Sequence, residues 1–178
     1  MKINADGFAF DFTDAIDVFV FDEKDKFKPK FHGLSHAMQA VDLIVELEND
    51  YLFIEVKDFH APDDYNFKKA VNDERVKQRR EYFNHLREVL KHKFRDSWLY
   101  RWAENKVEKP IRYICLLTLD SAMISIMNKE LHKQLPVGCA GPRWTGEVAR
   151  SCAVVNLDRW NNNFPKWPVS RTAVTGGT

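Results

Sequence analysis

The sequence predicts a mixed α/β fold in which a central β-sheet is flanked by helices. Two short apolar runs, residues 41–47 and 51–57, are rich in Val, Ile, Leu and Phe, a composition typical of buried strands. Residues 66–94 then repeat apolar side chains at helical spacing, and further strand-like and helix-like segments alternate after them. Strands that alternate with helices indicate layers of helix packed on sheet, rather than an all-helical or all-β protein.

The segments before the first of these strands are less regular. Residues 13–21 carry Thr13 as a helix-capping residue and apolar side chains at helical spacing, although their β-branched and aromatic content also suits a strand. We expect a helix there. Residues 22–32 are charged, contain Pro29 and should form a loop, and residues 34–40 should form a short helical turn.

The strands 41–47 and 51–57 are close enough in sequence to form a β-hairpin. Only Glu48, Asn49 and Asp50 separate them. Asn49-Asp50 suits a two-residue hairpin loop, because both residue types tolerate positive φ.

This loop predicts which side chains share a face of the sheet. It would pair Ile44 with Glu55 and Asp42 with Lys57. Because paired residues share a face, as do residues two apart on one strand, Asp42, Glu55 and Lys57 should emerge together. A three-residue loop would shift the pairing by one residue and move Asp42 to the opposite face.

The rest of the chain alternates between helices and strands. The expected elements are helices at 66–94, 97–105 and 121–134, strands at 111–119 and 152–157, and a Gly/Pro-rich loop at 138–146. We expect a single domain over residues 1–160, followed by an irregular C-terminal tail over residues 161–178.

Length and composition are those of an ordinary globular domain. The chain has 178 residues, of which 44% are hydrophobic and 30% charged, which excludes a disordered or fibrous chain. No apolar run approaches the ~18 residues of a membrane span, and the N-terminus lacks the apolar core of a signal peptide. The three cysteines have no Cys-x-x-Cys spacing, which favours reduced thiols. We therefore expect a cytoplasmic protein without a membrane partner.

Charge is distributed unevenly, although the formal net charge is only +1. Residues 1–65 hold 15 acids and 6 bases, whereas residues 66–95 hold 10 bases and 4 acids. Acids can hold a metal ion while nearby bases hold phosphates. On charge alone, a solvated helix face is the simpler interpretation.

Asp42, Glu55 and Lys57 on one face form a set suited to metal-assisted hydrolysis. Two adjacent carboxylates repel each other unless a cation lies between them. Mg²⁺ or Mn²⁺ prefers such oxygen ligands and keeps positions open for water and phosphate. A neighbouring lysine can orient or help to deprotonate the attacking water and can stabilise charge on the phosphate. Metal-assisted phosphodiester hydrolysis requires this combination of groups.

A cross-strand salt bridge on the surface is the structural alternative, because an acid-x-Lys triplet arises by chance in a chain of this size. The flanking residues Phe53, Ile54 and Val56 argue against it, since they make the strand apolar on both faces. A strand buried on both faces is not expected to carry three charged residues that have no function.

A second signal lies in the long helix. Gln78 and Tyr82 are four residues apart and fall on the apolar stripe of Phe67, Val71 and Leu86. A Gln on a core-facing stripe needs a hydrogen-bond partner, which the backbone at the edge of the core could also supply. The basic neighbours either flank a phosphate path or are merely solvated; they are Lys77, Arg79 and Arg80.

The pair Val41-Asp42, followed by Glu55-Val56-Lys57, resembles the signature of the PD-(D/E)xK nuclease superfamily. The resemblance implies a restriction-endonuclease-like mixed sheet and metal-dependent hydrolysis of phosphodiester bonds. It also implies that Asp42 and Glu55 are metal ligands, that the backbone carbonyl of Val56 is a third, and that Lys57 is the catalytic lysine.

The element Gln78-x-x-x-Tyr82 is similar to that of the RecB-like branch in particular, and the resemblance covers residues 36–82. It implies that Gln78 and Tyr82 help to position the DNA or the active-site lysine. Val41 stands where the superfamily's name has Pro. The upstream metal ligand is not assigned, with His36, Asp14 and Asp17 as the candidates, and the core strand expected before the Asp42 strand is not identified.

From these observations we expect a Mg²⁺- or Mn²⁺-dependent nuclease that acts on DNA in preference to RNA. The alternative is a non-catalytic nucleic-acid-binding or protein-interaction module on the same fold, which would bind no divalent ion of consequence. An enzyme of another chemistry is a third interpretation and predicts metal binding without cleavage. The small size leads us to expect low specificity, a homodimer or a subunit of a larger assembly.

Overall fold

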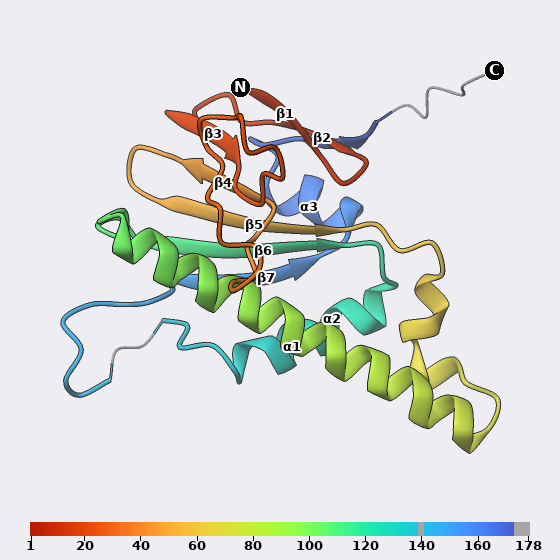
Figure 1. Cartoon of the computed structure of the whole chain (residues 1–178). Helices are drawn as coiled ribbons and strands as arrows, with labels where there is room; N and C mark the ends of the chain where they lie inside the picture. The colour runs from red at the N-terminus through yellow and green to blue at the C-terminus, as the bar shows by residue number, and fades with distance from the viewer. Residues whose placement is uncertain (139–140, 173–178) are drawn as a thin grey trace.

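The chain folds around a five-stranded mixed β-sheet (Figure 1). The computed structural model describes residues 1–138 and 141–172. The strands β3, β4 and β5 are antiparallel neighbours, whereas β5, β6 and β7 run parallel to one another. Their bounds are Asp17–Val20 (β3), Leu43–Glu46 (β4), Tyr51–Lys57 (β5), Ile111–Leu117 (β6) and Ser151–Val155 (β7).

Different layers cover the two faces of this sheet (Figure 1). Helices α1 (Asp73–Ala103) and α2 (Ser121–His132) pack on one face. Helix α3 (Leu157–Asn163) and a small antiparallel sheet cover the other face. The strands of the small sheet are β1 (Lys2–Ala5), β2 (Phe8–Asp11) and β8 (Val169–Arg171). The predicted α/β fold, with a central mixed sheet flanked by helices, is therefore confirmed.

The central strand β5 is buried on both sides. Its residues Tyr51 and Phe53 belong to the core beneath the helices. The alternate residues, in the core beneath the small sheet, are Leu52, Ile54 and Val56. Because side chains alternate along a strand, Glu55 and Lys57 lie on the face toward α1. Two 3₁₀ turns, η1 (Pro62–Tyr65) and η2 (Phe67–Lys69), connect β5 to α1.

The hairpin of β4 and β5 has a different register from the predicted one. Its loop has four residues, Leu47–Asp50, rather than two. When the ladder is extended by one residue, Asp42 lies opposite Glu55, so the predicted pairing of Asp42 with Lys57 is wrong. The difference is two residues, and a shift of two keeps every side chain on its face. The predicted shared face of Asp42, Glu55 and Lys57 therefore survives.

Residues 17–20 form strand β3, so the helix predicted at 13–21 is wrong. Val18 and Val20 pack against the core beneath the small sheet, whereas Phe19 packs against the core beneath the helices. This alternation has the period of a strand, and the β-branched and aromatic content outweighed the helix-like spacing. The strand β3 pairs with β4 and supplies the core strand missing before Asp42.

The chain begins with a hairpin, β1–β2, that was not predicted. Its turn is Asp6-Gly7, and both residues have positive φ angles of 43° and 81°. An Asp-Gly pair is favoured in such turns, because their geometry needs positive φ at both central positions.

One continuous helix, α1, replaces the two helices predicted at 66–94 and 97–105. It begins at Asp73, where the Asn72 side chain accepts a hydrogen bond from the Arg75 N–H (2.9 Å). Residues 67–69, predicted as part of the helix, form the separate turn η2.

The C-terminal segment was predicted to be irregular from residue 161, and up to residue 171 this prediction is wrong. Helix α3 extends to Asn163, and β8 pairs with β2 in the small sheet. Residues 173–178 of that tail, and residues 139–140 of the predicted loop at 138–146, lie outside the described residues.

Among the described helices, none has both the length and the apolar character needed to cross a membrane. Cys115 and Cys152 are buried free thiols, and Cys139 lies outside the described residues.

Candidate active site

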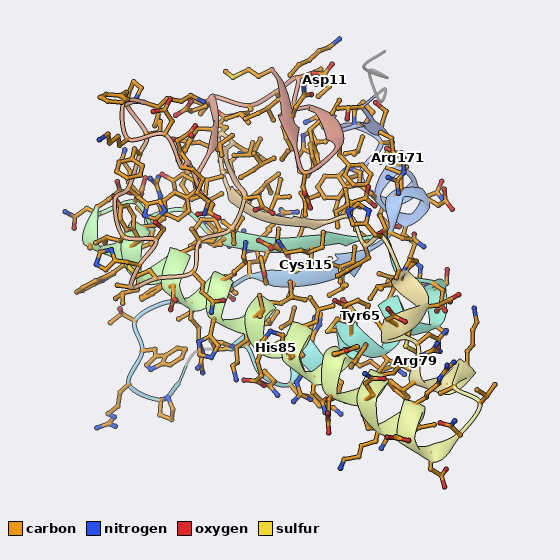
Figure 2. All side chains as sticks on the ribbon, turned by 45° about the vertical axis from the view of Figure 1, so that its right-hand side comes forward. Asp11, Tyr65, Arg79, His85, Cys115 and Arg171 are labelled. Carbon is orange, nitrogen blue, oxygen red and sulfur yellow. The ribbon has the colours of Figure 1, made fainter. Side chains whose placement is uncertain are left out.

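The hairpin of β4 and β5 brings two carboxylates together on the face toward α1. Asp42 directly precedes β4, and its Oδ2 accepts a hydrogen bond from the Val56 N–H (2.7 Å). Because Val56 follows Glu55, this bond fixes the Asp42 side chain beside that of Glu55. In Figure 2 the place can be found from Cys115, the residue of β6 that pairs with Glu55.

Glu55 is fully buried, with an exposed fraction of 0%. Two ammonium groups lie within ion-pair distance of its carboxylate, with Lys57 Nζ at 3.1 Å from Oε1 and Lys93 Nζ at 2.9 Å from Oε2. Burial, and then the nearby charge of Asp42, raise the pKa of Glu55 to about 7, although both lysines act in the opposite direction.

Lys57 is more accessible than Asp42, Glu55 or Lys93, with 33% of its side chain exposed. Burial alone would lower the pKa of Lys57, but the carboxylates of Glu55 and Asp42 outweigh burial and raise it. Asp6, in the turn between β1 and β2, acts in the same direction. The Lys57 ammonium is therefore held in its charged form at neutral pH.

Lys93 completes the charged cluster, which we define as Asp42, Glu55, Lys57 and Lys93. Lys93 lies on α1 and is only 9% exposed. Its Nζ is 3.5 Å from Asp42 Oδ1, in addition to its contact with Glu55. Lys93 was not predicted as a site residue, although the sequence carries one signal for it. It lies on the same helix face as the buried residues Leu86, Leu90 and Ser97, where an unpaired lysine is rare.

Gln78 and Tyr82 were predicted from their spacing to lie on the buried stripe of α1, and this prediction is wrong. Tyr82 is 44% exposed, and Gln78 is exposed and donates a hydrogen bond from Nε2 to the Tyr82 hydroxyl (3.2 Å). The first turns of α1 extend past the sheet and pack on η1 and η2 instead (Figure 1). The buried face of α1 therefore starts only at Phe83, and Val71 lies before the helix and is 82% exposed.

An aromatic series nevertheless connects Tyr82 to the neighbourhood of Lys57. The Tyr82 ring lies 6.3 Å from that of Tyr65, which lies 4.5 Å from the ring of Phe59, two residues after Lys57. Burial raises the pKa of Tyr65, and the charge of Lys57 partly offsets this effect. Tyr82 is thus placed at the outer end of a path that leads toward the cluster.

None of the three candidates for an upstream metal ligand contacts the cluster through a hydrogen bond or ion pair within the described residues. Asp17 pairs with Glu46, at the opposite end of β4 from Asp42. Asp14 lies before β3, and both Asp14 and Asp17 form ion pairs elsewhere. His36 is exposed in the loop before β4.

The residues present fit a small, hard divalent ion in part. Asp42 and Glu55 offer carboxylate oxygens, which Mg²⁺ and Mn²⁺ prefer. The backbone of Val56, the third ligand implied by the resemblance, lies directly between Glu55 and Lys57 on β5. Across the residues that the structure describes, no group of three or more His, Cys, Asp or Glu side chains is gathered in a metal-binding arrangement. The side-chain ligands found together are therefore a pair.

Comparisons with known proteins do not place the chain in a family. No family model matches it, and neither the curated proteins nor the solved structures include a significant match.

Proposed function

We propose that the chain is a metal-dependent nuclease that hydrolyses phosphodiester bonds of nucleic acid, with Asp42, Glu55 and Lys57 at its active site. The observation that carries the proposal is Glu55, a fully buried carboxylate that lies beside a second carboxylate and is ion-paired with Lys57 and Lys93. These partners do not fully compensate its burial, because the pKa of Glu55 is raised despite both lysines. Groups of this kind, with a strongly shifted pKa, are concentrated at functional sites.

Asp42 and Glu55 would hold the ion, together with the backbone of Val56. When bound there, Mg²⁺ or Mn²⁺ would activate a water molecule and stabilise negative charge on the phosphate. Asp42 is already oriented for this role. The Val56 N–H holds its Oδ2, and its Oδ1 lies on the side of Lys93 and does not accept this bond.

The contacts of Lys57 favour one of the two roles considered for it. Its pKa is raised by two carboxylates, so its ammonium does not readily give up a proton. A charged lysine cannot accept a proton from water, but it can orient the nucleophile and stabilise charge on the phosphate. We therefore assign Lys57 to electrostatic stabilisation, with its partly exposed side chain facing the substrate.

Nucleic acid is the proposed substrate because the first turns of α1, residues 73–80, hold four bases against two acids and lie at the outer end of the aromatic path. Figure 2 shows Tyr65 and Arg79 at the end of the molecule where η1 meets α1. Arg79 donates a hydrogen bond to the Asn66 carbonyl (3.2 Å), and Arg80 lies over the Phe67 ring (5.1 Å). These two arginines therefore also hold η2 against α1. A phosphate backbone is attracted to such a basic surface, and exposed rings can stack on bases. DNA in preference to RNA remains our expectation.

A second candidate, a non-catalytic module that binds nucleic acid or a protein, is favoured by one observation. The charged cluster contains two acids and two lysines, so its formal charge is zero without any metal ion. Such a cluster has no excess negative charge that a metal ion would have to balance. The module would use the same basic and aromatic surface but would neither need a divalent ion nor cleave.

Cleavage assays separate these two functions. The purified chain would be incubated with single- and double-stranded DNA and RNA in Mg²⁺, in Mn²⁺ or in chelator. We expect cleavage only with metal, and a loss of about 100-fold or more in Glu55→Gln and in Lys57→Met. The control Lys133→Met, which removes an exposed lysine from the end of α2, should cleave like the unaltered chain. Metal-independent binding without cleavage would instead identify the module.

A further inference from the structure

Lys93 is a buried lysine for which the proposed function has no role. It lies on the apolar face of α1 between Leu90 and Phe94, both 0% exposed. Its Nζ lies 2.9 Å from Glu55 Oε2 and 3.5 Å from Asp42 Oδ1. A lysine is seldom buried on such a face unless its charge is compensated.

The two lysines of the cluster do not occupy equivalent positions. Lys57 comes from the same strand as Glu55, which is its only ion-pair partner in the described part of the chain. Lys93 comes from the opposite layer and is within ion-pair distance of both acids. Since Asp42 Oδ2 is taken by the Val56 N–H, the remaining oxygen of Asp42 and one oxygen of Glu55 converge on the Lys93 ammonium.

The fold fixes Lys93 in this place through the next turn of its own helix. Ser97 Oγ accepts a hydrogen bond from the Val41 N–H (2.9 Å), and Asp96 Oδ2 accepts one from the Gln39 N–H (2.9 Å). Helix α1 thus holds the segment that leads directly into Asp42. The distance between Lys93 and the two acids is set by these anchors rather than by a mobile surface side chain.

From this arrangement we propose that Lys93 is an internal counter-ion, which holds the cation position between Asp42 and Glu55 until a divalent ion displaces its ammonium. The inference rests on the proposed function, because it concerns the same site. A lysine suits the role, since its charge is compact and its four-carbon stem is flexible enough to withdraw. Metal-free folding then does not leave two uncompensated carboxylates side by side, and ion binding has to compete with an internal charge.

The test uses Mn²⁺ binding to the full chain by calorimetry, together with thermal unfolding in chelator. Lys93→Met keeps the length of the side chain and removes its charge. We expect it to bind Mn²⁺ at least about tenfold more tightly than the unaltered chain, because a unit charge within a few ångströms of both ligands is lost. In chelator it should unfold at a lower temperature, and Mn²⁺ should restore its stability more than it stabilises the unaltered chain.

A matched control is available on the same helix. Lys91 also forms an ion pair, with Glu88, but does so away from the cluster, so Lys91→Met should bind Mn²⁺ like the unaltered chain. Should Lys93→Met fail to fold in chelator, circular dichroism would follow its recovery with Mn²⁺. Recovery supports the proposal, and absence of recovery overturns it.

The outcomes separate the inference from the proposed function. Equal or weaker Mn²⁺ binding by Lys93→Met overturns the counter-ion role, while metal-dependent cleavage by the unaltered chain would still stand. If neither protein binds Mn²⁺, both the inference and the metal-dependent function fail. Tighter binding in Lys93→Met alone, with no change in Lys91→Met, is the result that supports the inference.

Discussion

The two faces of β5 are built from alternate residues of one seven-residue strand, yet they differ in chemistry. Toward the small sheet, Ile54 and Val56 pack in an apolar core with Trp160. Toward α1, Tyr51 and Phe53 pack in the core beneath the helices, and the charged Glu55 and Lys57 follow them. Because side chains alternate along a strand, one that is buried on both sides can place apolar core residues on one face and reactive groups on the other.

The largest loss of stability should come from a substitution on the apolar face of β5, the face toward the small sheet. Trp160 is 0% exposed, packs edge-on against Phe10 at 5.4 Å and donates a hydrogen bond to the Trp167 carbonyl (2.7 Å). Trp160→Ala should lower the free energy of unfolding by about 3–5 kcal/mol, as large core truncations do. Chemical unfolding in urea would measure the loss.

An exposed tryptophan provides the matched control. Trp144 is 48% exposed, and Trp144→Ala should change the free energy of unfolding by less than about 0.5 kcal/mol. In the fraction of Trp160→Ala that remains folded, Mn²⁺ affinity should equal that of the unaltered chain. A large change in that affinity would mean that the two faces of β5 are not independent.

The next largest effect on stability arises on the face of β5 toward α1, and it depends on pH. Glu55 has a pKa of about 7 in the folded chain against an ordinary value of 4.5. Between these values the folded chain keeps a proton that the unfolded chain has lost. The contribution of Glu55 to stability is therefore fully present below pH 4.5, falls as pH rises and is lost above pH 7. The total loss is about 3 kcal/mol.

Glu55→Gln removes this titrating group and almost none of the volume. From pH 4.5 to pH 8 in chelator, its stability relative to the unaltered chain should rise by about 3 kcal/mol. Urea unfolding of both proteins at the two pH values measures this difference. The same stability difference at both pH values would show that Glu55 is not the buried titrating group of this face.

The sequence predicted the charged face better than the fold around it. Two-residue periodicity placed Asp42, Glu55 and Lys57 on one face, and this result holds even though the loop is two residues longer than predicted. The strand β3 was predicted as a helix, because short apolar segments satisfy both periodicities and only the ladder with β4 decides between them. The pair Asp6-Gly7 is itself a hairpin signal, although no hairpin was predicted there.

Two features of the site depend on tertiary packing and could not be predicted from local patterns. Lys93 is separated from Glu55 by 38 positions in the sequence and meets it only because α1 packs across β5. Gln78 and Tyr82 have helical spacing with Leu86, but the sheet does not extend beneath the first turns of α1, so they are exposed. Periodicity indicates which residues share a helix face, and it does not indicate where along the helix the core begins.

A smaller effect tests the hydrogen bond that orients Asp42. In Asp42→Ala the Val56 N–H loses its acceptor, and leaving a buried donor unpaired costs about 1–3 kcal/mol. In Asp42→Asn the side-chain carbonyl can still accept this bond, so its loss of stability should be smaller. Both variants remove the carboxylate and should lose Mn²⁺ binding. Equal unfolding free energies for the two variants would show that the bond contributes nothing to the fold.

The smallest effect on stability is expected at an ion pair that joins the small sheet to the residue after β5. Arg171, at the end of β8, forms a two-point ion pair with Asp58, the residue after Lys57, and the Asp6 carboxylate accepts a hydrogen bond from the Asp58 N–H (3.2 Å). The Arg171 guanidinium lowers the pKa of Asp58. The stabilisation by this ion pair is therefore fully present above the ordinary pKa of an aspartate. It is lost as the pH falls through the lowered pKa of Asp58. Because both side chains are partly exposed, Asp58→Asn should cost at most about 1 kcal/mol at neutral pH. Urea unfolding would measure it, and Mn²⁺ affinity should not change. A lowered affinity would instead show that the small sheet helps to position Lys57, and the separation of stability from chemistry along β5 would then be incomplete.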